Sequence, residues 1–132
     1  MALNMTKIAF RVPNLPALQK RLEAMGPDAK ITTRYCPKRA DEMVGGSLFW
    51  IIDHALVGRT PIRGFRQREE DGRWEVQLEP RLIPVHPRPK RAHQGWRYLA
   101  ADDAPRDLAD GEDIGEMLPG RLMGKLQKLG LI

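Results

Sequence analysis

The chain has 132 residues, of which 42% are hydrophobic and 30% are charged. This length allows one domain with one core but not comfortably two, and the composition excludes both a disordered chain and a membrane-spanning one. The formal net charge of +5 favours nucleic acid or another anionic partner.

The first ten residues lack the basic start and long apolar stretch of a secretory signal, so we expect a cytoplasmic protein without membrane contact. The single cysteine, Cys36, agrees with this location because no disulfide can form within the chain.

Residues 5–12 alternate loosely and include β-branched and aromatic members, which predicts a first strand ended by Pro13. A helix follows, with Asn14 as a good N-cap and Pro16 in the first turn. Four apolar residues recur at helical spacing before Gly26 ends the helix: Leu15, Leu18, Leu22 and Met25. One face of this helix should cover the core.

The middle of the chain predicts short elements. We expect an extended segment over residues 30–36, a short helix over 37–44 closed by two glycines, and a strongly apolar strand over 47–57. Residues 62–68 and 74–78 read as two further strands joined by a hairpin turn at Asp71-Gly72.

The last third predicts a strand over 82–85, a loop over 86–94, a strand over 96–99, a carboxylate-rich loop over 102–116 and a helix over 117–129. A leucine stripe on that helix either packs on the sheet or faces another subunit: Leu118, Leu122, Leu126 and Leu129. These elements predict one α+β domain over 1–132, with a strongly curved mixed or antiparallel sheet that approaches a small barrel and is flanked by helices.

The segment 81–98 carries no acidic residue and is rich in arginine, lysine, proline and aromatic residues. Such a segment supplies cations for phosphates and flat rings on which unpaired bases stack. Trp96 and Tyr98 should share one strand face, with Arg97 on the other. An outward face would make a stacking platform, whereas an inward face, which is commoner for aromatics, would make ordinary core. A merely solvated basic loop is the alternative for the cations.

Two further basic groups precede this segment. Lys38 and Arg39 lie at the N-terminus of the short predicted helix, where positive charge opposes the helix dipole, and this placement suggests a use. Four arginines either extend the same surface or, as we favour, pair with carboxylates on the neighbouring strand: Arg59, Arg63, Arg66 and Arg68.

Enzymatic readings have less support. Histidines 54, 86 and 93 with Cys36 lack the close spacing of a zinc site, so we expect no metal and no cofactor. Asp53-His54 interrupts the most apolar strand, and a buried, hydrogen-bonded histidine explains this better than proton transfer does. The pair stays a minor catalytic candidate, and Cys36 reads as a small, partly buried hydrophobe.

Several motifs together resemble the bacterial family named domain of unknown function 1489. They are Pro37-Lys38-Arg39-Ala40-Asp41-Glu42, Gly45-Gly46-Ser47-Leu48-Phe49-Trp50, Pro87-Arg88-Pro89 and Gln94-Gly95-Trp96-Arg97-Tyr98-Leu99. The resemblance spans nearly the whole chain and implies no activity or site residue. The order of elements also looks like the PUA-like barrels, which commonly bind RNA or modified bases.

From the acid-free segment we expect a non-catalytic module that binds RNA, a nucleotide or another polyanion in a basic groove. The residues expected to form that groove are Lys38, Arg39, Arg88, Lys90, Arg91, Trp96 and Arg97. A homo-oligomer or protein-interaction module built on the C-terminal leucine helix is the first alternative, and a small enzyme using Asp53 and His54 is the second.

Overall fold

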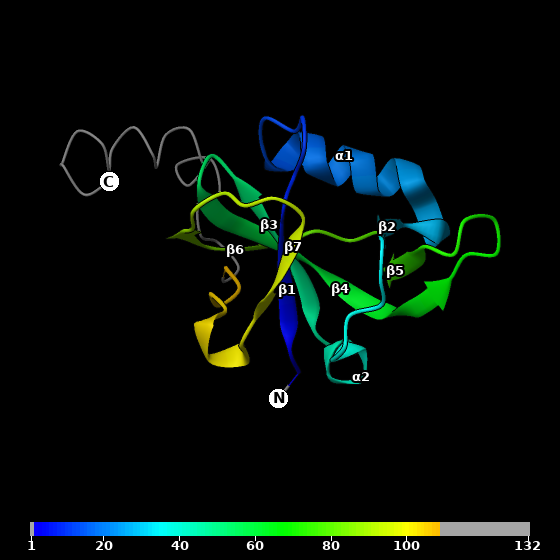
Figure 1. Cartoon of the computed structure of the whole chain (residues 1–132). Coiled ribbons are helices and arrows are strands. Elements are labelled where there is room, and N and C mark those ends of the chain that lie inside the picture. The colour runs from blue at the N-terminus through cyan, green and yellow to red at the C-terminus, as the bar shows by residue number, and fades with distance from the viewer. Residues whose placement is uncertain (1, 109–132) are drawn as a thin grey trace, which may run out of the picture.

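The computed structural model describes residues 2–108 and consists of one curled sheet with two helices (Figure 1). The strands are β1 (Asn4–Ile8), β2 (Lys30–Thr33), β3 (Ser47–Ile52), β4 (Ala55–Gln67), β5 (Trp74–Leu78), β6 (Ile83–Pro89) and β7 (Trp96–Leu99). The helices are α1 (Leu15–Met25) and α2 (Ala40–Met43), with short 3-10 turns η1 (Gly26–Asp28) and η2 (Ala101–Asp103). The expected α+β class and strongly curved sheet are confirmed, whereas the expected helix over 117–129 lies outside the described residues.

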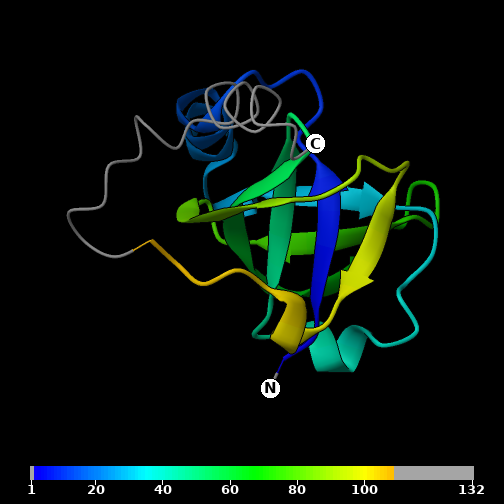
Figure 2. The ribbon, with the colours of Figure 1, turned by 90° about the vertical axis from the view of Figure 1, so that its left-hand side faces the viewer.

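The seven strands follow the order β2-β5-β4-β3-β1-β7, and β6 pairs with β4 off this path. Strands β1 and β3 run parallel and the other pairs are antiparallel. The first half of β4 pairs with β3 and β6 and its second half pairs with β5, with a register shift between Ile62 and Gly64. This bulged, shared strand curls the sheet into a half-barrel, as Figure 2 shows.

The main core lies on the inner, concave face of the sheet, under α1. Asn14 caps this helix by accepting a hydrogen bond from the Ala17 backbone N–H at 3.0 Å. Leu15, Leu18 and Leu22 are buried against the sheet, as their spacing predicts. Within the described residues no helix is long and apolar enough to cross a bilayer.

A smaller core covers the outer, convex face. Its buried members come from four strands: Phe49, Ile51, Leu56, Val85 and Leu99. The chain after β7 packs over them through Ala104, and Arg59 on β4 holds this segment by two hydrogen bonds to the Asp107 carboxylate, at 2.7 and 2.8 Å. Strand β3 is therefore buried on both faces.

Several predicted boundaries are wrong. Strand β2 ends at Thr33 rather than at residue 36, α2 spans 40–43 rather than 37–44, and three larger differences concern the other strands. Strand β1 ends at Ile8 rather than at residue 12, and Phe10 beyond it is 65% exposed. The strand expected over 47–57 is two strands, because Asp53 and His54 take φ values of 50° and 61° and form a tight hairpin turn. The loop expected over 86–94 begins only after Pro89, since β6 pairs with β4 as far as that residue, and its other side forms only an isolated bridge, between Val85 and Asp107, so that the later prolines lie at an edge that tolerates them.

Candidate nucleic-acid interface

The two end strands of the sheet, β2 and β7, line one hollow of about 390 Å³. The hollow, here called the edge cleft, exists because the curled sheet brings its two edges face to face (Figure 1). Its walls and floor are formed by Lys7, Ile31, Thr32, Thr33, Arg34, Gln94, Gly95 and Trp96. These residues come from opposite ends of the strand order.

A second hollow of about 440 Å³ adjoins the edge cleft, since both share Lys7, Gln94 and Gly95. Both volumes fall in the range of small-molecule sites. No carboxylate occurs among the described residues that line either hollow. Lys7 and Arg34 also form no ion pair with any described residue, so their charges face the cleft without a local counter-ion.

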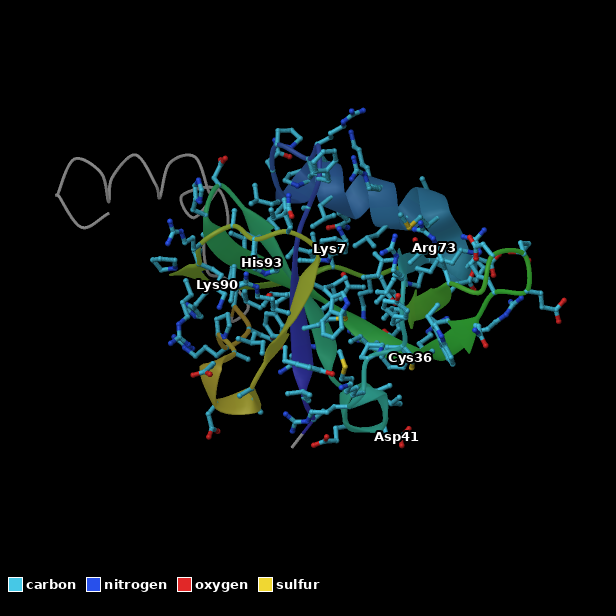
Figure 3. The ribbon with its side chains drawn as sticks, viewed as in Figure 1. Lys7, Cys36, Asp41, Arg73, Lys90 and His93 are labelled. Atoms are coloured by element: carbon cyan, nitrogen blue, oxygen red, sulfur yellow. The ribbon has the colours of Figure 1, made fainter. Side chains whose placement is uncertain are left out.

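Lys7 occupies an unusual position for a cation. On β1 it is directly opposite Trp50 of β3 and Trp96 of β7, and cross-strand partners point to the same face. That is the inner face, where Trp50 is buried in the core. Lys7 is half-buried and lines both hollows. Figure 3 labels Lys7 near the centre of the sheet.

Trp96 and Tyr98 share the inner face of β7, and Arg97 points to the outer face, because these residues pair with Lys7, Met5 and Thr6 respectively. The two rings meet edge to face, with centroids 4.9 Å apart and planes at 86°. Trp96 is half-buried against the core, whereas Tyr98 is 38% exposed. Both rings therefore lie on the inner face, but only Trp96 packs against the core, whereas Tyr98 is exposed and is not part of it.

Arg39 lies beside Tyr98. Its backbone N–H donates to the Tyr98 hydroxyl at 3.2 Å, and its guanidinium carbon is 5.8 Å from the ring centroid. The same guanidinium forms two hydrogen bonds to Glu42, at 2.7 and 2.8 Å, and they hold the pKa of that carboxyl below its usual value. Arg39 is thus partly neutralised, while its exposed neighbour Lys38 has no ion pair within the described chain.

The other predicted site residues lie away from the cleft. Arg97 and Arg88 face the outer side, since Arg88 is opposite Leu56 of the outer core and donates to the Asp103 carbonyl at 2.6 Å. Lys90 and Arg91 follow β6, where the Lys90 backbone N–H donates to the His54 carbonyl at 2.8 Å. Of the predicted site residues, Trp96 alone lines the cleft, and Arg39 lies beside Tyr98 with Lys38 next to it in the chain, whereas Arg88 and Arg97 face the outer side.

Of the four arginines, Arg59 on β4 and Arg68 just after β4 form ion pairs, though not with the partners we favoured, and Arg63 and Arg66 form none within the described chain. Arg59 binds Asp107, and Arg68 pairs with Glu70 at 3.1 Å within the turn. Arg66 is opposite Glu75 in the register, but the Glu75 carboxylate pairs with Lys30 on β2, at 3.3 Å. Pairing with carboxylates thus occurs, but the Glu75 carboxylate of the neighbouring strand β5 pairs with Lys30 of β2 and not with an arginine of β4.

The catalytic candidates occupy poor positions for chemistry. Asp53 and His54 are both exposed at a hairpin turn, so the expectation of a buried histidine is wrong. Cys36 is half-buried, and desolvation together with the nearby Asp41 raises the pKa of its thiol, which disfavours a thiolate nucleophile. Among the described residues, no three His, Cys, Asp or Glu side chains gather in a way that would hold a metal ion.

The sequence analysis did not predict the two charged residues of the cleft, Lys7 and Arg34. A signal for Lys7 exists, because it follows Met5 at a spacing of two and so takes an inward position on a strand that is otherwise apolar on that face. Arg34 carries no such signal, since it borders the cleft only because β2 is an edge strand.

Comparison with known proteins gives one match. A family model described as a protein of unknown function (DUF1489) matches residues 5–132. No curated protein and no solved structure matches the chain.

Proposed function

Because the chain belongs to the DUF1489 family, whose description carries no activity, we propose from the geometry that it is a non-catalytic module that binds single-stranded RNA in the edge cleft. The observation that carries the proposal is an acid-free hollow between two sheet edges, with Lys7 and Arg34 beside the Trp96 ring. Cations recruit the phosphates of a polyanion, and an indole face accepts a base of any sequence.

The surroundings of the cleft support the same ligand. The second hollow extends it past Gln94 and Gly95, which gives an extended chain a continuous path. Lys38 and Arg39 lie beyond Tyr98 at the other end of β7, so further phosphates would meet positive charge there. The likeness to PUA-like barrels is part of this proposal and rests on the order of elements alone.

The test measures binding of a fluorescent single-stranded RNA of about eight nucleotides, a length within the usual site size, over a range of salt concentrations. The double substitution K7A/R34A should weaken binding and make the plot of log K against log salt less steep by roughly 0.7 for each lost phosphate contact. K20A/R81A is the matched control, because Lys20 on α1 and Arg81 before β6 are both exposed and line neither hollow.

Two results contradict the proposal. One is undetectable RNA binding at low salt, and the other is equal affinity for K7A/R34A and K20A/R81A. A triple substitution, R88A/K90A/R91A, tests whether the RNA binds on the side of β6 instead of in the cleft. If this variant loses binding while K7A/R34A keeps it, the RNA lies on the side of β6 and the edge cleft is not the site.

A further inference from the structure

Each wall of the edge cleft is an unpaired sheet edge. Within residues 2–108, strand β2 is bonded only to β5, and β7 only to β1. Backbone N–H and C=O groups on the free side of such a strand have no partner in the sheet, so they remain available to a ligand.

The alternation of hydrogen bonds identifies which groups these are on β2. The Leu78 N–H donates to the Ala29 carbonyl at 2.8 Å, so every second residue from Ala29, which includes Ile31 and Thr33, points its backbone toward β5. Thr32 must then point its N–H and C=O away from β5, toward the cleft that it lines.

The same reasoning applies to β7. The Ala9 N–H donates to the Ile51 carbonyl at 3.0 Å, so Ala9 and Lys7 direct their backbone toward β3 and Thr6 directs its own toward β7. Arg97, the partner of Thr6, therefore faces β1, and the backbone groups of Trp96 and Tyr98 face the free edge. Donor and acceptor groups thus border the cleft on both walls.

Resting on the proposed function, we infer that the edge cleft holds one unpaired base and reads its Watson–Crick edge with these backbone groups. A base is flat enough to stack on Trp96, and its edge presents adjacent donors and acceptors that match a strand edge. Lys7 and Arg34 are placed for the phosphates on either side of the base. A base in a duplex has already used this edge, so the site selects single strands.

An extended peptide is the competing ligand, since it also bonds to free strand edges. A peptide backbone carries no charge, however, so it would not bind the two cations of the cleft, Lys7 and Arg34, which have no carboxylate beside them in its lining. A base with its phosphates uses the cations, the ring and the free edges together.

The experiment compares three RNA ligands at one salt concentration: a single strand, the same strand annealed to its complement, and the same strand with its bases removed at abasic sites. Loss of the stacked base should weaken binding about fivefold to a hundredfold, and the duplex should bind as weakly as the abasic strand. Equal binding of the normal and the abasic single strand by a protein whose K7A/R34A variant binds neither would overturn the inference and leave the proposed function standing.

The role of Trp96 is tested by combining substitutions of this residue with removal of the RNA bases, to see whether the two effects depend on each other. In W96L the difference between the normal and abasic strands should disappear, whereas W96F, which keeps a ring, should retain part of it. If W96L fails to fold, W96F still tests the contact between Trp96 and the base. RNA should quench the tryptophan fluorescence of the natural protein, and this quenching should be lost in W96F, which retains Trp50 and Trp74. Full discrimination by W96L, or displacement of RNA by an extended acidic peptide of similar charge at lower concentration, contradicts the inference.

Discussion

Thr6 on β1 and His93 before β7 share a buried hydrogen bond of 2.8 Å between Oγ1 and Nε2, although 87 positions separate them. The other ring nitrogen, Nδ1, lies 3.3 Å from the Gln94 carbonyl, which only accepts, so in the neutral ring Nδ1 donates to this carbonyl and Nε2 accepts from the Thr6 hydroxyl. The bond fixes the loop that carries Gln94 and Gly95, two residues shared by both hollows. A contact on the outer face thereby positions the cleft on the inner face.

Replacement of Thr6 by Val should lower the free energy of unfolding by about 1–3 kcal/mol, because a buried imidazole nitrogen loses its donor at nearly constant volume. Urea unfolding measures the change. Thr32→Val is the control, since the Thr32 side chain is exposed and a strand accepts valine equally well. Equal stability of the two variants would contradict a role for the Thr6–His93 bond.

A second prediction concerns two glycines that lie at strand ends or bulges without a positive φ. A Cβ at Gly46 would collide with the Leu3 carbonyl oxygen, whereas a Cβ at Gly64 would meet only the end of the Gln77 side chain, at 3.4 Å. Gly46→Ala should therefore destabilise the fold by a few kcal/mol, about the size of an overpacked core position. Gly64→Ala should change stability by less than about 0.5 kcal/mol, as a surface substitution does.

Thermal and urea unfolding of both glycine variants check this contrast. If Gly46→Ala matched Gly64→Ala in stability, the close approach of residues 3 and 46 would not be as the structure has it. The approach matters for the cleft because the Asn4 side chain accepts from the Ser47 N–H at 2.8 Å in the same place, which aligns β1 with β3.

Much of the fold follows from local patterns. The Asn14 cap, the leucine spacing of α1 and the Asp71-Gly72 turn are read directly from neighbours in the chain, and each element forms where they predict it. The turn at Asp53-His54 was not predicted, because both residues adopt left-handed backbone angles in a turn whose usual sequence is Asn-Gly. A polar pair within an apolar run does not distinguish a turn from an interrupted strand.

The candidate site was harder to predict, for a topological reason. Strand periodicity correctly separates Trp96 and Tyr98 from Arg97, but it cannot show that β2 and β7 meet, because that depends on how far the sheet curls. The acid-free segment 81–98 therefore divides between two faces, with Arg88 on the outer one and Trp96 on the inner one. Residues that are neighbours in this segment of the sequence therefore do not form one surface.

A third prediction uses the hairpin turn between β3 and β4. Asp53 and His54 both take positive φ, which costs a residue with a Cβ about 1 kcal/mol relative to glycine. His54→Gly should raise the free energy of unfolding by up to about 1 kcal/mol, since type I′ turns favour glycine at this position. His54→Ala keeps the Cβ and should give no gain, and an equal gain from both variants would contradict the strain argument.

The last prediction concerns acid. The hydrogen bonds from Arg59 lower the pKa of the Asp107 carboxyl in the folded protein, so this pair stabilises the fold above the ordinary aspartate pKa of about 3.9 and stops doing so as pH falls through the lowered value. Because the carboxylate side chain is 45% exposed, screening limits the effect to about 1 kcal/mol or less.

Asp107→Asn should accordingly be less stable than the natural protein at pH 7, and the difference should shrink as the pH falls from about 4, the ordinary aspartate pKa, through the lowered pKa of the folded carboxyl. Urea unfolding at a series of pH values measures it. Asp102→Asn serves as control, because Asp102 is exposed in η2 and has no ion pair within the described chain. A constant difference across the series would show that Asp107 acts through its shape or neutral hydrogen bonding and that its charge does not hold the last described segment against β4.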